Sequence, residues 1–105
     1  MVEGSNPFRP ALTMVKEIRA SHILVKTEDK AKELLTKIQT GQPFEKIAET
    51  ESQCPSRKKG GDLGWFGRGS MVRAFENTAF NLKKGELGII RTEFGWHIIK
   101  KTDEK

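Results

Sequence analysis

Two short stretches near opposite ends of the chain decide the predicted fold: Ser21-His22-Ile23-Leu24-Val25 and Trp96-His97-Ile98-Ile99-Lys100. Each is an aliphatic run led by a histidine, and these are the only two histidines among 105 residues. Runs rich in β-branched residues are typical of strands. We therefore predict that the two strands lie side by side in one sheet and bring both imidazoles together.

The residues that follow the first stretch predict one strand and two helices. Residues 17–25 alternate between two faces that both hold apolar side chains, so this strand is expected inside the sheet. Thr27 is a predicted N-cap for a helix that ends at Gly41. Pro43 is expected at the first position of a second, shorter helix.

The second half of the chain is predicted to be a long loop followed by three further elements. Residues 52–69 hold five glycines and are expected to form a loop with a short strand near 63–66. A helix over 72–80, with Val72, Phe75 and Ala79 on its inward stripe, precedes a hairpin of 87–91 and 96–101 joined through 92–95. This order predicts the α+β class, with helices packed against the sheet.

Length and composition favour one domain, which we place at residues 16–105, preceded by a disordered tail at 1–15. Met14 is a candidate native start, in which case the residues before it are vector-derived. The net charge is +5, but acidic residues interrupt the basic ones throughout, which argues against nucleic-acid binding. Neither a secretion signal nor a membrane span is recognisable, and a single cysteine fits a reducing compartment. We expect a cytoplasmic monomer.

The scarce reactive side chains leave three interpretations open. Cys54 with His22 or His97, and Thr92 as an orienting group, could form a nucleophilic site. Two histidines and one cysteine could also bind a metal, although their spacing matches no known zinc motif. Alternatively, both histidines are hydrogen-bonded core residues and the cysteine is a small buried apolar side chain.

Large apolar residues are dense around the glycine-rich segment. They are Leu63, Trp65, Phe66, Met71 and Phe75. Trp65 or Phe66 is expected in the core, whereas Met71 and Phe75 are four residues apart and share a helix face. Such a face beside polar groups suits a small apolar ring such as that of proline.

Five blocks of sequence together resemble, in order and spacing, the signature of the parvulin family of peptidyl-prolyl cis/trans isomerases. The resemblance covers about residues 17–102. The blocks are Arg19-Ala20-Ser21-His22-Ile23-Leu24-Val25, Ser52-Gln53-Cys54-Pro55-Ser56, residues 60–69, Met71-Val72-Arg73-Ala74-Phe75-Glu76, and Phe94-Gly95-Trp96-His97-Ile98-Ile99-Lys100.

The resemblance implies a four-stranded antiparallel sheet wrapped by about four helices, in a single-domain prokaryotic-type isomerase. It implies catalysis on X-Pro bonds of peptides and folding proteins, with no cofactor or metal. By position, the residues similar to the family's catalytic network are His22, Cys54, Thr92 and His97. The residues similar to its proline pocket are Leu63, Met71 and Phe75, with Phe94 at the border.

The sequence departs from the phosphate-dependent parvulins, which carry a basic cluster in an extended loop after the first strand. Here that connection is short, Lys26-Thr27-Glu28-Asp29-Lys30, and partly acidic, so we expect no phosphate dependence. Arg57, Lys58 and Lys59 could instead favour acidic residues before proline. Two other functions stay open: a proline-peptide binding or chaperone module without turnover, and a Cys/His hydrolase.

Overall fold

The computed structural model describes residues 15–105, whose strands form an antiparallel sheet in the order β2-β1-β4-β3. The predicted α+β class is therefore confirmed, with three α-helices and one 3-10 helix. The elements are β1 (Glu17–Val25), α2 (Glu28–Gln39), α3 (Phe44–Glu51), η1 (Pro55–Lys59), β2 (Asp62–Gly67), α4 (Arg73–Asn81), β3 (Leu87–Thr92) and β4 (Gly95–Glu104).

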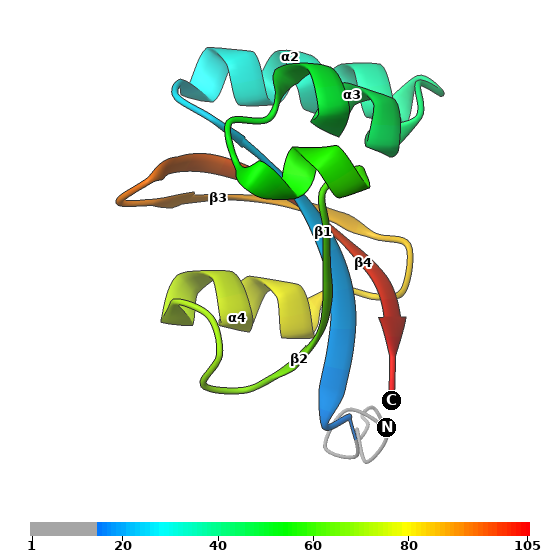
Figure 1. The fold of residues 1–105 in the computed structure, drawn as a ribbon, viewed down its shortest axis with the longest axis vertical. Helices are drawn as coiled ribbons and strands as arrows, with labels where there is room; N and C mark the ends of the chain where they lie inside the picture. Colours follow the sequence, from blue (N-terminus) through cyan, green and yellow to red (C-terminus); the bar gives the residue numbers. More distant parts are fainter. Residues whose placement is uncertain (1–14) are drawn as a thin grey trace, which may run out of the picture.

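Helices cover both faces of the sheet, with α2 and α3 on one side and α4 on the other (Figure 1). Alternation along β1 supplies both cores: Ile23 and Val25 pack with α2 and α3, whereas Ile18 and Ala20 pack with α4. Neighbouring β4 residues divide in the same way, since Ile98 joins the first cluster and Ile99 the second. Because both faces of the sheet are covered, β1 has apolar residues at both its odd and its even positions.

The two strands that carry the histidines are paired, as predicted. β1 and β4 are the central strands and run antiparallel, with Leu24 opposite His97 and His22 opposite Ile99. Both histidines therefore point to the same face of the sheet, the one that α4 covers. The pairing places them diagonally, at a separation that two long side chains can bridge.

The helix boundaries follow local chemistry, with one correction. Thr27 is the N-cap of α2, since its hydroxyl accepts the amide N–H of Lys30 at 3.2 Å, as predicted. Pro43 is the N-cap of α3 and not its first helical residue, because its ψ of 129° is still extended. The residues expected to face inward from this helix, Phe44, Ile47 and Ala48, are buried.

The second half departs from the prediction in two places. Part of the predicted loop is the 3-10 helix η1, in which Pro55 supplies a fixed φ at the start. Val72 is not on the buried stripe of α4, because it is the extended N-cap residue and is 44% exposed. The expectation that Trp65 or Phe66 lies in the core is confirmed, because Phe66 is buried whereas Trp65, its neighbour in β2, faces the opposite side.

The chain termini of the described part lie near one end of the sheet, where Lys16 and Glu17 donate backbone hydrogen bonds to the carbonyl of Lys105. Val15 packs against the core on the α4 side. The rest of the predicted tail lies outside the described residues. In residues 15–105, no helix is long and apolar enough to cross a membrane.

A matched pair of glycine substitutions tests how tightly β2 is held against β1. Gly61 has a φ of +87°, and a Cβ there would lie 2.5 Å from the backbone oxygen of His22. Gly64 has a similar φ of +76° but faces open space. Both alanine variants carry the strain of a positive φ, but only Gly61→Ala adds a clash with the His22 carbonyl. The free energy of unfolding, measured in urea, should therefore fall about 2 kcal/mol further for Gly61→Ala than for Gly64→Ala. Equal losses for both variants would contradict the close approach.

Candidate functional site

The centre of the candidate site is a contact between the two imidazoles on the α4 face of the sheet. Nδ1 of His22 lies 3.0 Å from Nδ1 of His97, and the side chains are 6% and 5% exposed. Phe75 of α4 lies edge-on to both rings, with centroids 5.6 Å away in each case. The prediction that the strands bring both histidines together is confirmed.

Thr92, at the end of β3, extends this contact into a chain of hydrogen bonds. Its Oγ1 accepts the amide N–H of Phe94 at 3.2 Å and lies 2.7 Å from Nε2 of His97. A hydroxyl has one proton and two acceptor lone pairs, so its own proton has a partner here only when Thr92 donates to Nε2 of His97 while accepting from Phe94. Neutral His97 then carries its proton on Nδ1 and donates it to Nδ1 of His22. The proton of His22 is thereby assigned to Nε2.

Burial keeps both imidazoles neutral. Desolvation, and secondarily the nearby His97, lower the pKa of His22 from 6.5 to about 4. Desolvation also lowers the pKa of His97. A base with a pKa this far below neutral pH is poorly matched to proton transfer. The geometry and the pKa direction both favour a fixed neutral pair that donates and accepts hydrogen bonds.

Nε2 of His22 is a buried ring nitrogen without a hydrogen-bond partner among the described residues. Leaving a buried donor unpaired costs about 1–3 kcal/mol, so native structures rarely keep one without a reason. His22 also lines the apolar pocket described below, where a bound peptide could supply a partner.

Cys54 lies on the loop between α3 and η1, which Ser52 ties to β1. The hydroxyl of Ser52 accepts the amide N–H groups of Leu24 at 3.0 Å and Cys54 at 3.3 Å, and Gln53 N–H donates to the Leu24 carbonyl at 2.8 Å. The half-buried Cys54 thiol makes no hydrogen bond to an imidazole within residues 15–105. A Cys/His nucleophilic pair is therefore not assembled in this geometry.

The predicted site residues gather around one apolar pocket of about 410 Å³, a size typical of ligand sites. Thr92 is placed behind His97 and is not part of the lining. The pocket is lined by the other seven predicted residues, His22, Cys54, Leu63, Met71, Phe75, Phe94 and His97, and by Leu24, Gln53, Pro55 and Val72. At 65% exposure, Phe94 forms an open rim.

Four lining residues and one supporting residue were not predicted. Leu24 was detectable, because it lies two residues after His22 on the same strand face. Gln53 and Pro55 adjoin Cys54 in sequence, but no local pattern says which neighbours of a loop residue face a pocket. Ser52, only 2% exposed, acts through backbone contacts that depend on the folded loop.

The described residues contain no group of three or more histidine, cysteine or carboxylate side chains arranged to hold a metal ion. The metal-site interpretation thus has no geometric support in residues 15–105. In this part of the chain, an apolar pocket lies beside the neutral, hydrogen-bonded imidazoles of His22 and His97.

A pocket of this kind at this place in an α+β sheet defines a class, the peptidyl-prolyl isomerases, and comparison with known proteins agrees. The family model described as the PPIC-type PPIase domain matches residues 10–105. The chain belongs to this family and is a parvulin-type peptidyl-prolyl isomerase domain.

Individual relatives share both sequence and fold. The foldase protein PrsA of Geobacillus kaustophilus is 53% identical over 91 residues, which are 85% of this chain and 32% of that protein. The structure of peptidylprolyl isomerase PrsA from Bacillus anthracis is 47% identical with a TM-score of 0.85, covering 87% of this chain and 43% of that one. The parvulin NmPin of Nitrosopumilus maritimus is 43% identical with a TM-score of 0.76, covering 82% and 95%. The chain thus spans about a third of the length of its PrsA relatives.

The hydrogen-bond chain makes a direct prediction about tautomers. At pH 7, ¹⁵N imidazole spectra should show His97 protonated on Nδ1 and His22 on Nε2, because only this arrangement also gives the hydroxyl proton of Thr92 a partner. Thr92→Val removes the donor and should shift the tautomer of His97, whereas Thr92→Ser should retain it. Wild-type spectra with the opposite tautomers would contradict the assignment.

The lowered pKa of His22 also predicts a pH-dependent stability. A group with a depressed folded-state pKa stabilises the fold fully above its unfolded value of 6.5, and this contribution is lost as the pH falls toward about 4. The free energy of unfolding should therefore drop by about 2 kcal/mol between pH 7 and pH 5, because the unfolded chain takes up the proton more readily. Urea titrations measure this. The His22→Gln variant should show a clearly smaller drop, and an unchanged slope would count against the buried neutral imidazole.

Proposed function

We propose that this domain isomerises X-Pro bonds in unfolded and folding client proteins by holding the proline ring in the apolar pocket. The observation that carries the proposal is the pocket itself, with Leu63, Met71 and Phe75 around the neutral pair His22 and His97. It offers an apolar space large enough for a proline ring and its neighbours, beside polar groups that hydrogen-bond to one another.

The reaction explains why such a pocket suffices. Rotation about an X-Pro bond faces a barrier of roughly 18–20 kcal/mol, and no covalent bond is made or broken. In the twisted state the amide has lost resonance, so its carbonyl oxygen carries less charge and its nitrogen becomes a better acceptor. A site that grips the ring, releases the carbonyl from water and presents oriented dipoles favours that state over both planar ones. Lowering the barrier by about 4 kcal/mol gives a roughly thousandfold acceleration.

We assign the polar residues positioning and electrostatic roles. Thr92 fixes the tautomer of His97, which in turn fixes His22, so the floor of the pocket keeps one pattern of donors and acceptors. Cys54 lines the pocket and has an electrostatic or hydrogen-bonding role. A nucleophilic role is not assigned, because its thiol has no imidazole partner within residues 15–105. Hydrolysis through a Cys/His pair has no support in this geometry.

Phosphate independence is supported by the connection between β1 and α2. Only Lys26 and Thr27 separate these elements, so no extended basic loop lies beside the pocket. We infer that the isomerase accepts unphosphorylated X-Pro segments.

The client proteins and the setting of the domain are proposals as well. Relatives about three times as long carry the name foldase, which favours a role in assisting protein folding, here as a catalytic domain. The cytoplasmic location stays a prediction, based on the unpaired Cys54, and so does the monomeric state. A binding module without turnover is the alternative, and exchange measurements separate the two.

Two phenylalanines on one helix test whether the pocket performs the reaction. Phe75 and Phe80 are both buried on α4, but only Phe75 lines the pocket. Phe75→Leu and Phe80→Leu should lower stability similarly, by about 1 kcal/mol. Exchange spectroscopy on Ala-X-Pro peptides should show kcat/KM reduced about tenfold for Phe75→Leu and nearly unchanged for Phe80→Leu.

The same experiment decides the wider proposal. Wild-type protein that leaves cis/trans exchange unaccelerated, while the peptide still shifts pocket resonances, would establish the binding module. Equal losses for both variants would show that the pocket is not where the ring binds.

A further inference from the structure

A second cavity of about 420 Å³ adjoins the pocket that we assign to the proline ring. It is lined by Gln53, Cys54, Pro55, Arg57 and Lys58. The first three of these residues also line the proline pocket, so the two spaces share a wall. An extended peptide advances about 3.3–3.6 Å per residue, so a neighbour of the bound proline can reach the second cavity.

The second cavity is positively charged and carries no acidic side chain in its lining. Arg57 and Lys58 are both exposed, and neither takes part in an ion pair with the carboxylates of residues 15–105. The next residue, Lys59, faces elsewhere, into a polar cavity that also contains Glu45 and Asp62. The 3-10 geometry of η1 thus divides three consecutive basic residues between two surfaces.

The backbone that carries the basic residues is connected by hydrogen bonds to the strand of His22. At the start of η1 the amide N–H of Arg57 donates a hydrogen bond to the Cys54 carbonyl. At its end the N–H of Gly60 donates one to the Arg57 carbonyl, and both distances are 3.0 Å. The carbonyl of Gly61 then accepts the amide N–H of His22 at 2.9 Å. These bonds keep the backbone of Arg57 and Lys58 at the edge of the pocket that His22 lines.

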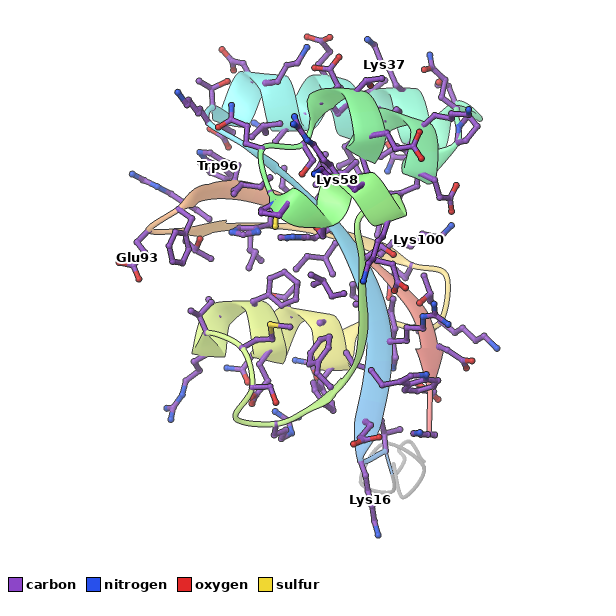
Figure 2. The ribbon with its side chains drawn as sticks, viewed as in Figure 1. Lys16, Lys37, Lys58, Glu93, Trp96 and Lys100 are labelled. Atoms are coloured by element: carbon purple, nitrogen blue, oxygen red, sulfur yellow. The ribbon has the colours of Figure 1, made fainter. Side chains whose placement is uncertain are left out.

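No acidic residue lines either of the two adjoining spaces. Figure 2 shows Lys58 on η1 and Glu93 well separated from it, at the tip of the hairpin between β3 and β4. Among the residues that line these two spaces, the formal charges are therefore the positive ones of Arg57 and Lys58, on the η1 side.

We propose that Arg57 and Lys58 form a subsite for the carboxylate of an acidic residue next to the isomerised proline. The arginine fork suits a carboxylate geometrically, and the lysine adds charge. This inference rests on the proposed function, since it assumes that the proline ring occupies the first pocket. It makes Glu-Pro and Asp-Pro segments the preferred substrates of the domain.

The test compares two peptides, Ala-Ala-Glu-Pro-Phe-Ala and the same peptide with Gln for Glu, and two charge-matched double variants. Arg57→Gln/Lys58→Gln removes the subsite, and Lys83→Gln/Lys84→Gln removes the same charge from the turn before β3. Dissociation constants come from NMR titration, and kcat/KM comes from exchange spectroscopy on the same samples. Wild type and the Lys83/Lys84 variant should bind the Glu peptide about fivefold more tightly than the Gln peptide. The Arg57/Lys58 variant should bind both peptides equally, and 0.5 M NaCl should reduce the wild-type preference.

Each outcome decides the proposal separately from the isomerase function. Equal wild-type dissociation constants for the two peptides overturn the subsite, even when both peptides are isomerised. A preference that persists in the Arg57/Lys58 variant, or disappears equally in the Lys83/Lys84 variant, also overturns it. Tighter binding of the Glu peptide without accelerated exchange supports the subsite and contradicts the proposed function.

Discussion

The hydrogen bond between Nδ1 of His22 and Nδ1 of His97 depends on one constraint, the antiparallel register of β1 and β4. Shifting that register by one residue would turn one histidine to the opposite face of the sheet. The same register places Ile98 and Ile99 in different cores. Strand alignment that builds both hydrophobic layers therefore also assembles the site.

One face of the sheet forms a continuous hydrophobic core, and the other face also carries the candidate site. On one face, α2 and α3 cover β1 and β4 with a continuous apolar cluster. On the other, α4 covers only part of the surface, and the space beside Phe75 becomes the apolar pocket in which we propose that the proline ring binds. The loop from Ser52 through η1 closes that pocket because it is anchored to the backbone of β1 at Leu24 and His22.

Burial gives the site its electrostatic character. Partial removal from water holds both imidazoles in the neutral form, and Thr92 selects the tautomers. A neutral floor suits a reaction whose transition state loses amide dipole and gains no net charge. Charge is found instead on η1, where Arg57 and Lys58 stay exposed at the pocket edge. In the proposed function, the neutral imidazoles and the charged edge would contact different parts of a peptide.

Local patterns determined much of this protein from the sequence alone. The bounds of β1, the Thr27 cap, the pairing of the histidine strands and the α+β class follow from residue periodicity and capping chemistry, which act within a few residues. The five sequence blocks also identified the residues that gather around the pocket. Tertiary structure alone decided the 3-10 helix, the exposure of Val72, the anchoring role of Ser52 and the orientation of Arg57 and Lys58 away from Lys59. These features depend on contacts between segments distant in sequence, and no local periodicity encodes which side of a loop faces a neighbouring strand.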